Sequence, residues 1–376
     1  NMEENAVIYD DMAGTADCEK PAIICASHDA NQMKHIAKKL LIPILASRPV
    51  TAIANRFIGC GIPVFMLHRI DCVEHSIAGS TRPDHLRRCL QYLVDHDYSL
   101  ISLEQLLTAL RNNQPLPHKA VAFTMDDGFT DQAKCAAPIF AEFNCPLTFF
   151  VITGMLDQAL WPWDAQAAWV TETSAKTVLE TTIAGNTFTL PLGDAYSRRL
   201  AKRVLHNAIR ELPSDQVEDI MNGIARDAGV VIPEKPPASY QPMSWEMARQ
   251  LERKGIQFAP HSVSHNVLSR LDSESMRQEI NDSWGTLDKE LLNPLRVFCY
   301  PTGRESDYGQ RETEALRESS FMGAVTTTPG FVDQMDAGDE TLFRIPRFSL
   351  PDAMHDFIQC CTWIEYAKGS HRSMGE

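Results

Sequence analysis

The sequence predicts an α/β fold, an irregular (β/α)7-type barrel with a helical and hairpin insertion after the third strand. From residue 63 onward, short apolar runs alternate with segments of helical periodicity, as in folds built on parallel strands. Polar side chains directly follow most of the apolar runs, and residues 154–240 interrupt the alternation. A length of 376 residues fits one large domain with extensions.

The expected strands are short apolar runs, and the expected helices have apolar residues every three or four positions. Most strands are followed by a helix, which favours parallel neighbours. The expected strands cover residues 63–67, 119–124, 146–152, 256–259, 297–300, 323–326 and 343–348, and the expected helices cover 82–95, 103–110, 132–143, 244–255, 273–292, 312–319 and 352–366.

The stretch 154–240 is interpreted as an insertion rather than a separate domain. A hairpin is expected at 182–190, with Gly185-Asn186 at its turn. Helical pieces follow, and four prolines between residues 233 and 242 indicate a linker back to the alternating pattern.

The remaining boundaries are an N-terminal extension 1–58, a domain 59–366 that includes the insertion, and a C-terminal tail 367–376. Residues 33–57 have helical periodicity together with several lysines and arginines. Such a segment either packs on the domain or makes a weak contact with a membrane surface. Prolines at positions 43 and 49 interrupt it, which favours packing.

Composition excludes several classes of protein. Hydrophobic residues make up 44% and charged residues 22%, which is typical of a globular chain and not of a disordered or coiled-coil one. A net charge of -14 argues against a nucleic-acid partner, since phosphate binding needs a basic surface. No apolar run is long enough for a transmembrane span.

Localisation is predicted from the first residues and the cysteines. The start lacks the layout of a secretion signal, so a cytoplasmic protein is expected, peripheral if 33–57 contacts lipid. An extracytoplasmic protein is expected instead if a leader has been removed. The ten cysteines form no C-x-x-C pair, and several lie in apolar strings, which favours buried thiols over a disulfide framework.

Catalytic groups in such folds lie at the carboxyl ends of the strands. Two adjacent carboxylates, Asp126 and Asp127, follow one apolar run and precede a helix. The alternative is a solvated Asp-Asp-Gly turn. Adjacent carboxylates also argue against glycoside hydrolysis, which needs two carboxyl groups about 5–9.5 Å apart.

His261 and His265 follow another apolar run at a spacing of four residues. On a helical turn this spacing places both imidazoles on one face, as a pair of metal ligands requires, although such pairs also occur by chance. Two imidazoles and one carboxylate make a three-ligand set for zinc or a similar divalent ion. The second aspartate would remain free to act as a base on the attacking water.

Three stretches resemble, in order, motifs of the polysaccharide deacetylases, the NodB-homology group known as carbohydrate esterase family 4. They are Phe123-Thr-Met-Asp-Asp-Gly128, His261-Ser-Val-Ser-His265 and Arg296-Val-Phe-Cys-Tyr-Pro-Thr-Gly303. Flanking stretches, among them Arg344-Ile-Pro-Arg347, are similar too. The resemblance covers roughly residues 60–350.

The resemblance implies a role for each matching residue. Asp127, His261 and His265 would bind a divalent metal, with zinc expected and cobalt, nickel or manganese as alternatives. Asp126 would be the general base. Arg296 would pair with Asp126 and hold its orientation.

On the substrate side, the backbone beyond Pro301 would form an oxyanion pocket together with the metal, and Tyr300, Pro301 and Gly303 are the candidate substrate-binding residues of this stretch. Trp163 is a candidate aromatic wall for a sugar ring, with core packing under a lid as the alternative. His68, at the end of the first strand, is the candidate general acid, as in some branches of the family, with a structural histidine as the alternative.

The sequence departs from the family pattern at three places. Met125 replaces a phenylalanine of the first motif, and Asn266 stands where a proline commonly follows the second histidine. No stretch matches the late Leu-x-His motif that supplies the acid in many members, because His355 lies within an expected helix.

These observations together predict a metal-dependent hydrolase that removes N-acetyl groups from amino sugars of a polysaccharide or a lipid-linked glycan. The partner is therefore an acetylated glycan. The alternatives are an O-acetyl esterase acting on a glycan and a non-catalytic glycan-binding module that kept the fold.

Overall fold

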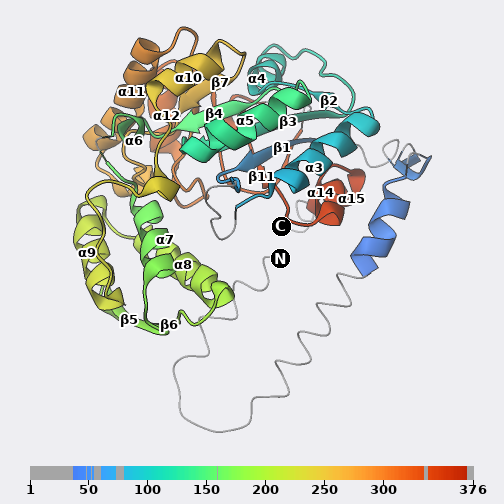
Figure 1. Ribbon diagram of the computed structural model, residues 1–376. Helices are drawn as coiled ribbons and strands as arrows, with labels where there is room; N and C mark the ends of the chain where they lie inside the picture. The colour runs from blue at the N-terminus through green and yellow to red at the C-terminus, as the bar shows by residue number, and fades with distance from the viewer. Residues whose placement is uncertain are drawn as a thin grey trace.

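The computed structural model describes residues 37–47, 49–51, 53–54, 61–72, 80–158, 160–333 and 338–370. Residues 1–36 of the expected N-terminal extension lie outside this part. A mostly parallel sheet forms the centre, in the order β10-β1-β3-β4-β7, with β11 beside β1 and β2 beside β3 (Figure 1). The bounds are β1 Ile62–Leu67, β2 Ser99–Leu100, β3 Ala120–Asp127, β4 Thr148–Val151, β7 Gln257–Pro260, β10 Phe331–Val332 and β11 Phe348–Ser349.

Two further strands, β8 (Val297–Cys299) and β9 (Gly323–Val325), form a parallel pair of their own. The Leu295 N–H donates to the Phe258 carbonyl at 2.7 Å, which joins this pair to β7. On the other side Val325 forms a parallel bridge with Ile345. The predicted α/β class with a mostly parallel sheet is confirmed.

Helices lie on both faces of the sheet, because each strand buries apolar side chains on both sides. β3 is buried along its whole length. Apart from the central part of the insertion, the helices are α3 Pro83–Asp95, α4 Leu103–Arg111, α5 Ala137–Glu142, α6 Thr153–Leu156, α10 Trp245–Glu252, α11 Ser273–Glu290, α12 Gln310–Glu318, α13 Asp339–Leu342, α14 Met354–Cys360 and α15 Trp363–Ser370, with single turns η1 Gln132–Ala136, η3 Ala238–Tyr240 and η4 Leu268–Arg270.

The insertion projects from one side of the sheet in Figure 1 and has a hydrophobic cluster of its own. Its hairpin turns at Ala184-Gly185, which have φ of 49° and 82°, because Asn186 already pairs with Ile183. The expected Gly185-Asn186 turn is therefore shifted by one residue. The elements are α7 Trp163–Thr173, β5 Val178–Ile183, β6 Asn186–Pro191, α8 Ala195–Ile209, η2 Ser214–Gln216 and α9 Val217–Ala228.

Several expected elements differ from the observed ones. The expected last strand, 343–348, is reduced to β11, because α13 and a turn occupy the residues before it. The expected last helix, 352–366, is two helices, α14 and α15, and α15 continues to Ser370 inside the expected tail.

The described part of the N-terminal extension contains a helix over residues 37–45. Lys38 pairs with Asp356 at 2.9 Å, and the Trp363 indole donates to the Leu45 carbonyl, so this helix contacts α14 and α15. Leu40, Leu41 and Ile44 are nevertheless exposed. Membrane contact therefore stays a prediction. Among the described residues, no helix combines the length and apolar character that crossing a bilayer requires.

Candidate active site

A cleft of about 420 Å³ opens at the carboxyl ends of the parallel strands. The insertion supplies one of its walls through residues of α7 and α8. Six residues singled out from the sequence line it, namely His68, Asp126, Asp127, His261, His265 and Tyr300. The tertiary structure thus brings the predicted metal, base and acid residues into one site.

Asp127, His261 and His265 form a compact buried group whose ligand atoms lie within 4.8 Å of one another. The two histidines do not share a helical turn, which their spacing had suggested, because residues 261–267 form a loop. Asp127 and His265 have left-handed backbones, with φ of 83° and 62°. A left-handed backbone is unfavourable for residues other than glycine, so the surrounding structure must hold both residues in place.

The donor set of this group fits a divalent metal such as zinc. The Nδ1 of His261 lies 2.8 Å from the Cys299 carbonyl, so its Nε2 is left to face Asp127, 3.8 Å away. The Nδ1 of His265 lies 3.4 Å from the carboxylate of Asp164. The His261 Nδ1 is thus held by a hydrogen bond, and the His265 Nδ1 faces a carboxylate at ion-pair distance. Outer partners of this kind usually orient metal-binding histidines.

Burial dominates the electrostatics of Asp127 and His261, whereas the neighbouring carboxylates, Asp164 above all, outweigh it at His265 and raise the pKa of that ring. The pKa of Asp127 is raised to about 6, mainly by burial and also by the nearby Asp164 and Asp126, against the influence of His68 and His265. Burial, together with His265, lowers the pKa of His261 to about 3, so this ring is neutral near pH 7. A divalent cation between these residues would offset the cost of a buried carboxylate.

Asp126 lies beside this group, at the end of β3, and Arg347 holds it. The two terminal guanidinium nitrogens donate to the two carboxylate oxygens, each at 2.7 Å. Burial by itself would raise the pKa of Asp126, but Arg347 outweighs it and keeps this pKa well below its ordinary value. The carboxylate is therefore ionised and fixed in orientation.

Arg347 is fully buried and saturated with partners. Besides Asp126, it donates to the Thr326 carbonyl, to the Thr124 hydroxyl and to the Cys299 sulfur, at 2.8, 2.9 and 3.2 Å. A buried guanidinium with all its nitrogens bonded is rigid, which suits a group that orients a catalytic base.

The expected pair between Arg296 and Asp126 is wrong. Arg296 instead stacks on Trp284, with its guanidinium carbon 4.5 Å from the ring centroid. Arg296 precedes β8 at the amino end of the strand, whereas the cleft lies at the carboxyl ends. The stretch Arg344-Ile-Pro-Arg347 resembles the family in sequence, but the sequence did not assign it to the site. In the structure Ile345 forms a bridge with Val325 of β9, and Arg347 reaches Asp126.

His68 follows β1 and faces the open side of the cleft, with about half of its side chain exposed. Its Nε2 lies 3.8 Å from the carboxylate of Asp126. Gln132, fully buried in η1, donates to the main-chain carbonyls of both residues and accepts from the Gly128 N–H. This glutamine ties the end of β1 to the end of β3, and sequence reasoning missed it.

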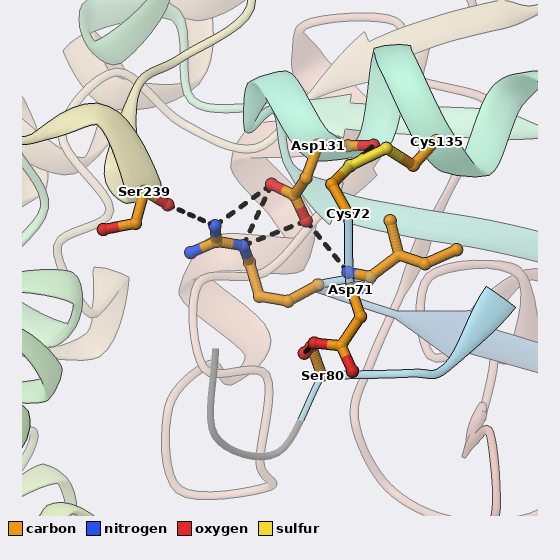
Figure 2. The surroundings of a disulfide bond; sticks show 8 residues. Asp71, Cys72, Ser80, Asp131, Cys135 and Ser239 are labelled. Carbon is orange, nitrogen blue, oxygen red and sulfur yellow. Dashed lines mark hydrogen bonds and ion pairs between the residues drawn. A yellow bond between two sulfur atoms is a disulfide. The ribbon is translucent and has the colours of Figure 1, made fainter. Parts of the chain in front are cut away.

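A disulfide between Cys72 and Cys135 reinforces the same connection, as Figure 2 shows. Next to it, Asp131 accepts from the Ile70 N–H at 2.9 Å and pairs with Arg69 at 3.1 Å. The expectation of free thiols is therefore wrong for these two cysteines, since the fold brings η1 against the segment after β1. Cys89, Cys145, Cys299, Cys360 and Cys361 are free thiols.

Removing the disulfide should lower stability. Because it links residues separated by 63 positions, the double variant Cys72→Ser/Cys135→Ser should lose about 2–4 kcal/mol of unfolding free energy in urea. Reductant should destabilise the wild type by a similar amount and leave the variant unaffected. Free thiols at both positions in the native protein, detected by mass spectrometry after alkylation, would contradict this.

The predicted substrate contacts have mixed outcomes. Tyr300 lines the cleft, but Pro301 and Gly303 do not, and Thr302 between them does. The amides of Tyr300 and Gly303 already donate to Val325 and Pro301, so they are not free to bind an oxyanion. If this turn binds the oxyanion, the backbone of Thr302 is therefore the candidate.

Trp163 is not an aromatic wall of the cleft. Its ring is buried against His206, with centroids 5.1 Å apart, and its indole donates to the His265 carbonyl at 3.3 Å. The alternative, core packing, is what the structure shows, because Trp163 belongs to the hydrophobic cluster of the insertion. The adjacent Asp164 lines the cleft instead.

Asp164 is a positioning residue that sequence reasoning did not assign. Since it fixes the outer nitrogen of His265, Asp164→Asn should weaken zinc affinity by about 10–100-fold. Competition with a chromophoric chelator measures this directly. Asp219→Asn, an exposed position on α9 of the same insertion, should bind zinc like the wild type. Equal affinities for both variants would contradict this role.

Comparisons with known proteins point to one family. The family model described as polysaccharide deacetylase matches residues 113–318, more than half of the chain. YxkH of Bacillus subtilis, which carries the same family name, is 26% identical over 100 residues, 27% of this chain and 34% of that protein. The poly-beta-1,6-N-acetyl-D-glucosamine N-deacetylase of Escherichia coli K12 is 32% identical over 78 residues, 21% of this chain and 12% of that enzyme.

Two solved structures share the fold. The Streptococcus pyogenes deacetylase PplD in complex with acetate has a TM-score of 0.52 at 19% identity, covering 81% of this chain and 98% of that one. IcaB from Ammonifex degensii has a TM-score of 0.51 at 15% identity, covering 81% and 97%. At these identities the similarity concerns the fold alone.

Proposed function

Because this chain belongs to the polysaccharide deacetylase family, we propose that it is a metal-dependent hydrolase that removes N-acetyl groups from amino sugars of a polysaccharide or lipid-linked glycan. One observation carries the proposal. The buried group of Asp127, His261 and His265 lies beside a second carboxylate, Asp126, that is fixed by Arg347 within an open cleft. Zinc is the expected ion, because two imidazoles and one carboxylate are a common zinc set.

The residues of the chain divide the reaction between them. A bound divalent cation would supply Lewis-acid polarisation of the amide carbonyl and of a water molecule. Asp126, ionised and oriented by Arg347, accepts the proton of the attacking water. His68, on the open side of the cleft, donates a proton to the departing amine, which is a poor leaving group without it.

The test combines metal analysis with acetate release. Purified protein should contain about one zinc per chain and release acetate from N-acetylated chitooligosaccharides, and both properties should be lost in Asp127→Ala. A chelator should abolish the activity, and added zinc should restore it. Release from O-acetylated glycans alone would instead indicate an esterase, and metal-free protein with sugar affinity a binding module.

We also propose that the protein works in an oxidising, extracytoplasmic compartment. The Cys72–Cys135 disulfide supports this, because such bonds persist mainly outside the reducing cytoplasm. Rapid alkylation of thiols in intact cells, followed by mass spectrometry, should find both cysteines oxidised. Finding them reduced would favour the cytoplasmic localisation expected from the sequence.

A further inference from the structure

The insertion helix α8 carries a row of cations beside the catalytic cleft. Arg199, Lys202, Arg203 and His206 are spaced by three, four and seven residues from the first, so they share one face of the helix. α8 contains no acidic residue. His206 is neutral near pH 7, because burial lowers its pKa to about 4. The charge of this face therefore comes from the two arginines and the lysine.

Two hollows meet at this face. The catalytic cleft of about 420 Å³ is bounded by Lys202, His206 and Arg304. A second hollow of about 490 Å³ is bounded by Arg199 and Arg203, and again by Lys202 and His206. Arg304, which donates to Asn207 of α8 at 2.9 Å, adds a further cation at the cleft side. We call Arg199, Lys202, Arg203 and Arg304 the basic groove.

The carboxylates near the basic groove act on its cations only at longer range, Asp164 on Lys202 and both Asp307 and Glu211 on Arg304. Within the described part of the chain, none of the four forms an ion pair with a carboxylate. Arg198, the other cation of α8, differs, because it donates to the carbonyls of Thr171, Glu172 and Ser174 and so holds α8 against α7.

The neighbouring carboxylates already have partners. Asp164 pairs with His265, Glu172 accepts from the Tyr240 hydroxyl at 2.7 Å, and Asp307 pairs with Arg210 at 2.7 Å. In a chain with a net charge of -14, four cations without a carboxylate ion pair, two of them on the active-site cleft and two on the adjoining hollow, are a marked local exception. The need of charged side chains for water does not explain why these cations gather at one place, because any part of the surface would provide it.

We propose that the basic groove binds an anionic group, a phosphate or a carboxylate, carried by the acetylated glycan substrate. The inference rests on the proposed function and specifies its substrate class. Arginine pairs bind such groups through bidentate hydrogen bonds, and Lys202 contributes charge at the point where both hollows meet. The acetylated sugar occupies the catalytic cleft, while the anionic part extends along α8.

The test compares three trisaccharides of equal length with the zinc-loaded, full-length protein. They are N-acetylated chitotriose, its 1-phosphate and its carboxylate-bearing aldonate. At low ionic strength, kcat/KM for acetate release should be at least about tenfold higher for an anionic substrate than for the neutral one, and salt should reduce this advantage. Preference for the phosphate or for the carboxylate identifies which anion the groove recognises.

The double variant Arg199→Gln/Arg203→Gln should lower the anionic-to-neutral ratio of kcat/KM by at least about fivefold. Arg111→Gln is the matched control, since Arg111 is an exposed arginine on α4, well separated from α8 in Figure 1. The control should keep the wild-type ratio.

The outcomes separate this inference from the proposed function. Equal cleavage of neutral and anionic substrates, with the ratio unchanged in the double variant, would contradict anion binding by the basic groove. The proposed deacetylase function would remain. If no trisaccharide releases acetate from zinc-loaded protein, the proposed function fails. In that case calorimetry with the 1-phosphate still decides: binding that the double variant loses supports the groove, and no binding to the wild type overturns it.

Discussion

Arg347→Met is expected to lower kcat/KM for acetate release by about 10²–10⁴-fold, the range found when a general base is lost. The substitution leaves the Asp126 carboxylate buried without its partner. Burial then raises the pKa of Asp126, and the carboxylate loses the two bonds that fix its orientation. Arg296→Met should change kcat/KM by less than about threefold, because it removes a stacking contact worth about 0.5–1 kcal/mol.

Steady-state kinetics of the two variants should be measured together with their thermal unfolding. Breaking a buried ion pair costs about 3–5 kcal/mol, so Arg347→Met could lose activity by unfolding. Arg347→Lys keeps the positive charge but not the bidentate geometry, and should have intermediate activity in a folded protein. Comparable losses for Arg296→Met and Arg347→Met would contradict the assignment of Arg347 as the orienting residue.

His68→Ala is expected to lower kcat on N-acetylated substrates by about 10²–10⁴-fold, as for loss of a general acid. Its zinc content should not change, because His68 is not part of the Asp127, His261 and His265 group. The leaving group of an ester is an alkoxide, which needs less help from an acid than the amine that leaves an amide. The loss on O-acetyl substrates should therefore be smaller.

Zinc analysis and parallel assays on N-acetyl and O-acetyl chitooligosaccharides check this expectation. His118→Ala is the matched control, because His118 is exposed and precedes β3 at the amino end of the sheet. If His68→Ala keeps its turnover on the amide, the general acid must be another group. If its zinc content falls, His68 acts through the metal instead.

Local sequence patterns were sufficient for the elements that carry the site. The apolar runs before His68, Asp126 and His261 formed strands of one sheet, with the polar residues at their carboxyl ends. The sequence also predicted that Asp127 and His265 would lie together. Their local geometry was not predictable, because the loop after β7 and the left-handed backbones depend on packing between the strand ends.

Residues that support the site from far away in the sequence could not be predicted. Arg347 reaches Asp126 across 221 positions, and the partner of His265 comes from the insertion. Cys72 and Cys135 were expected to be free, because no local spacing indicates that η1 packs against the segment after β1. These contacts follow from the order of strands in the sheet and from the placement of the insertion.

The amino-acid sequence by itself determined the fold class and the residues at the strand ends, since apolar periodicity and the adjacent polar residues are local properties of the chain. Only the tertiary structure decided which arginine orients Asp126, which carboxylate supports His265, and that the cations of α8 lie along the cleft and the hollow beside it. The physical reason is that a hydrogen bond or an ion pair depends on distance in space, which strand order and packing set.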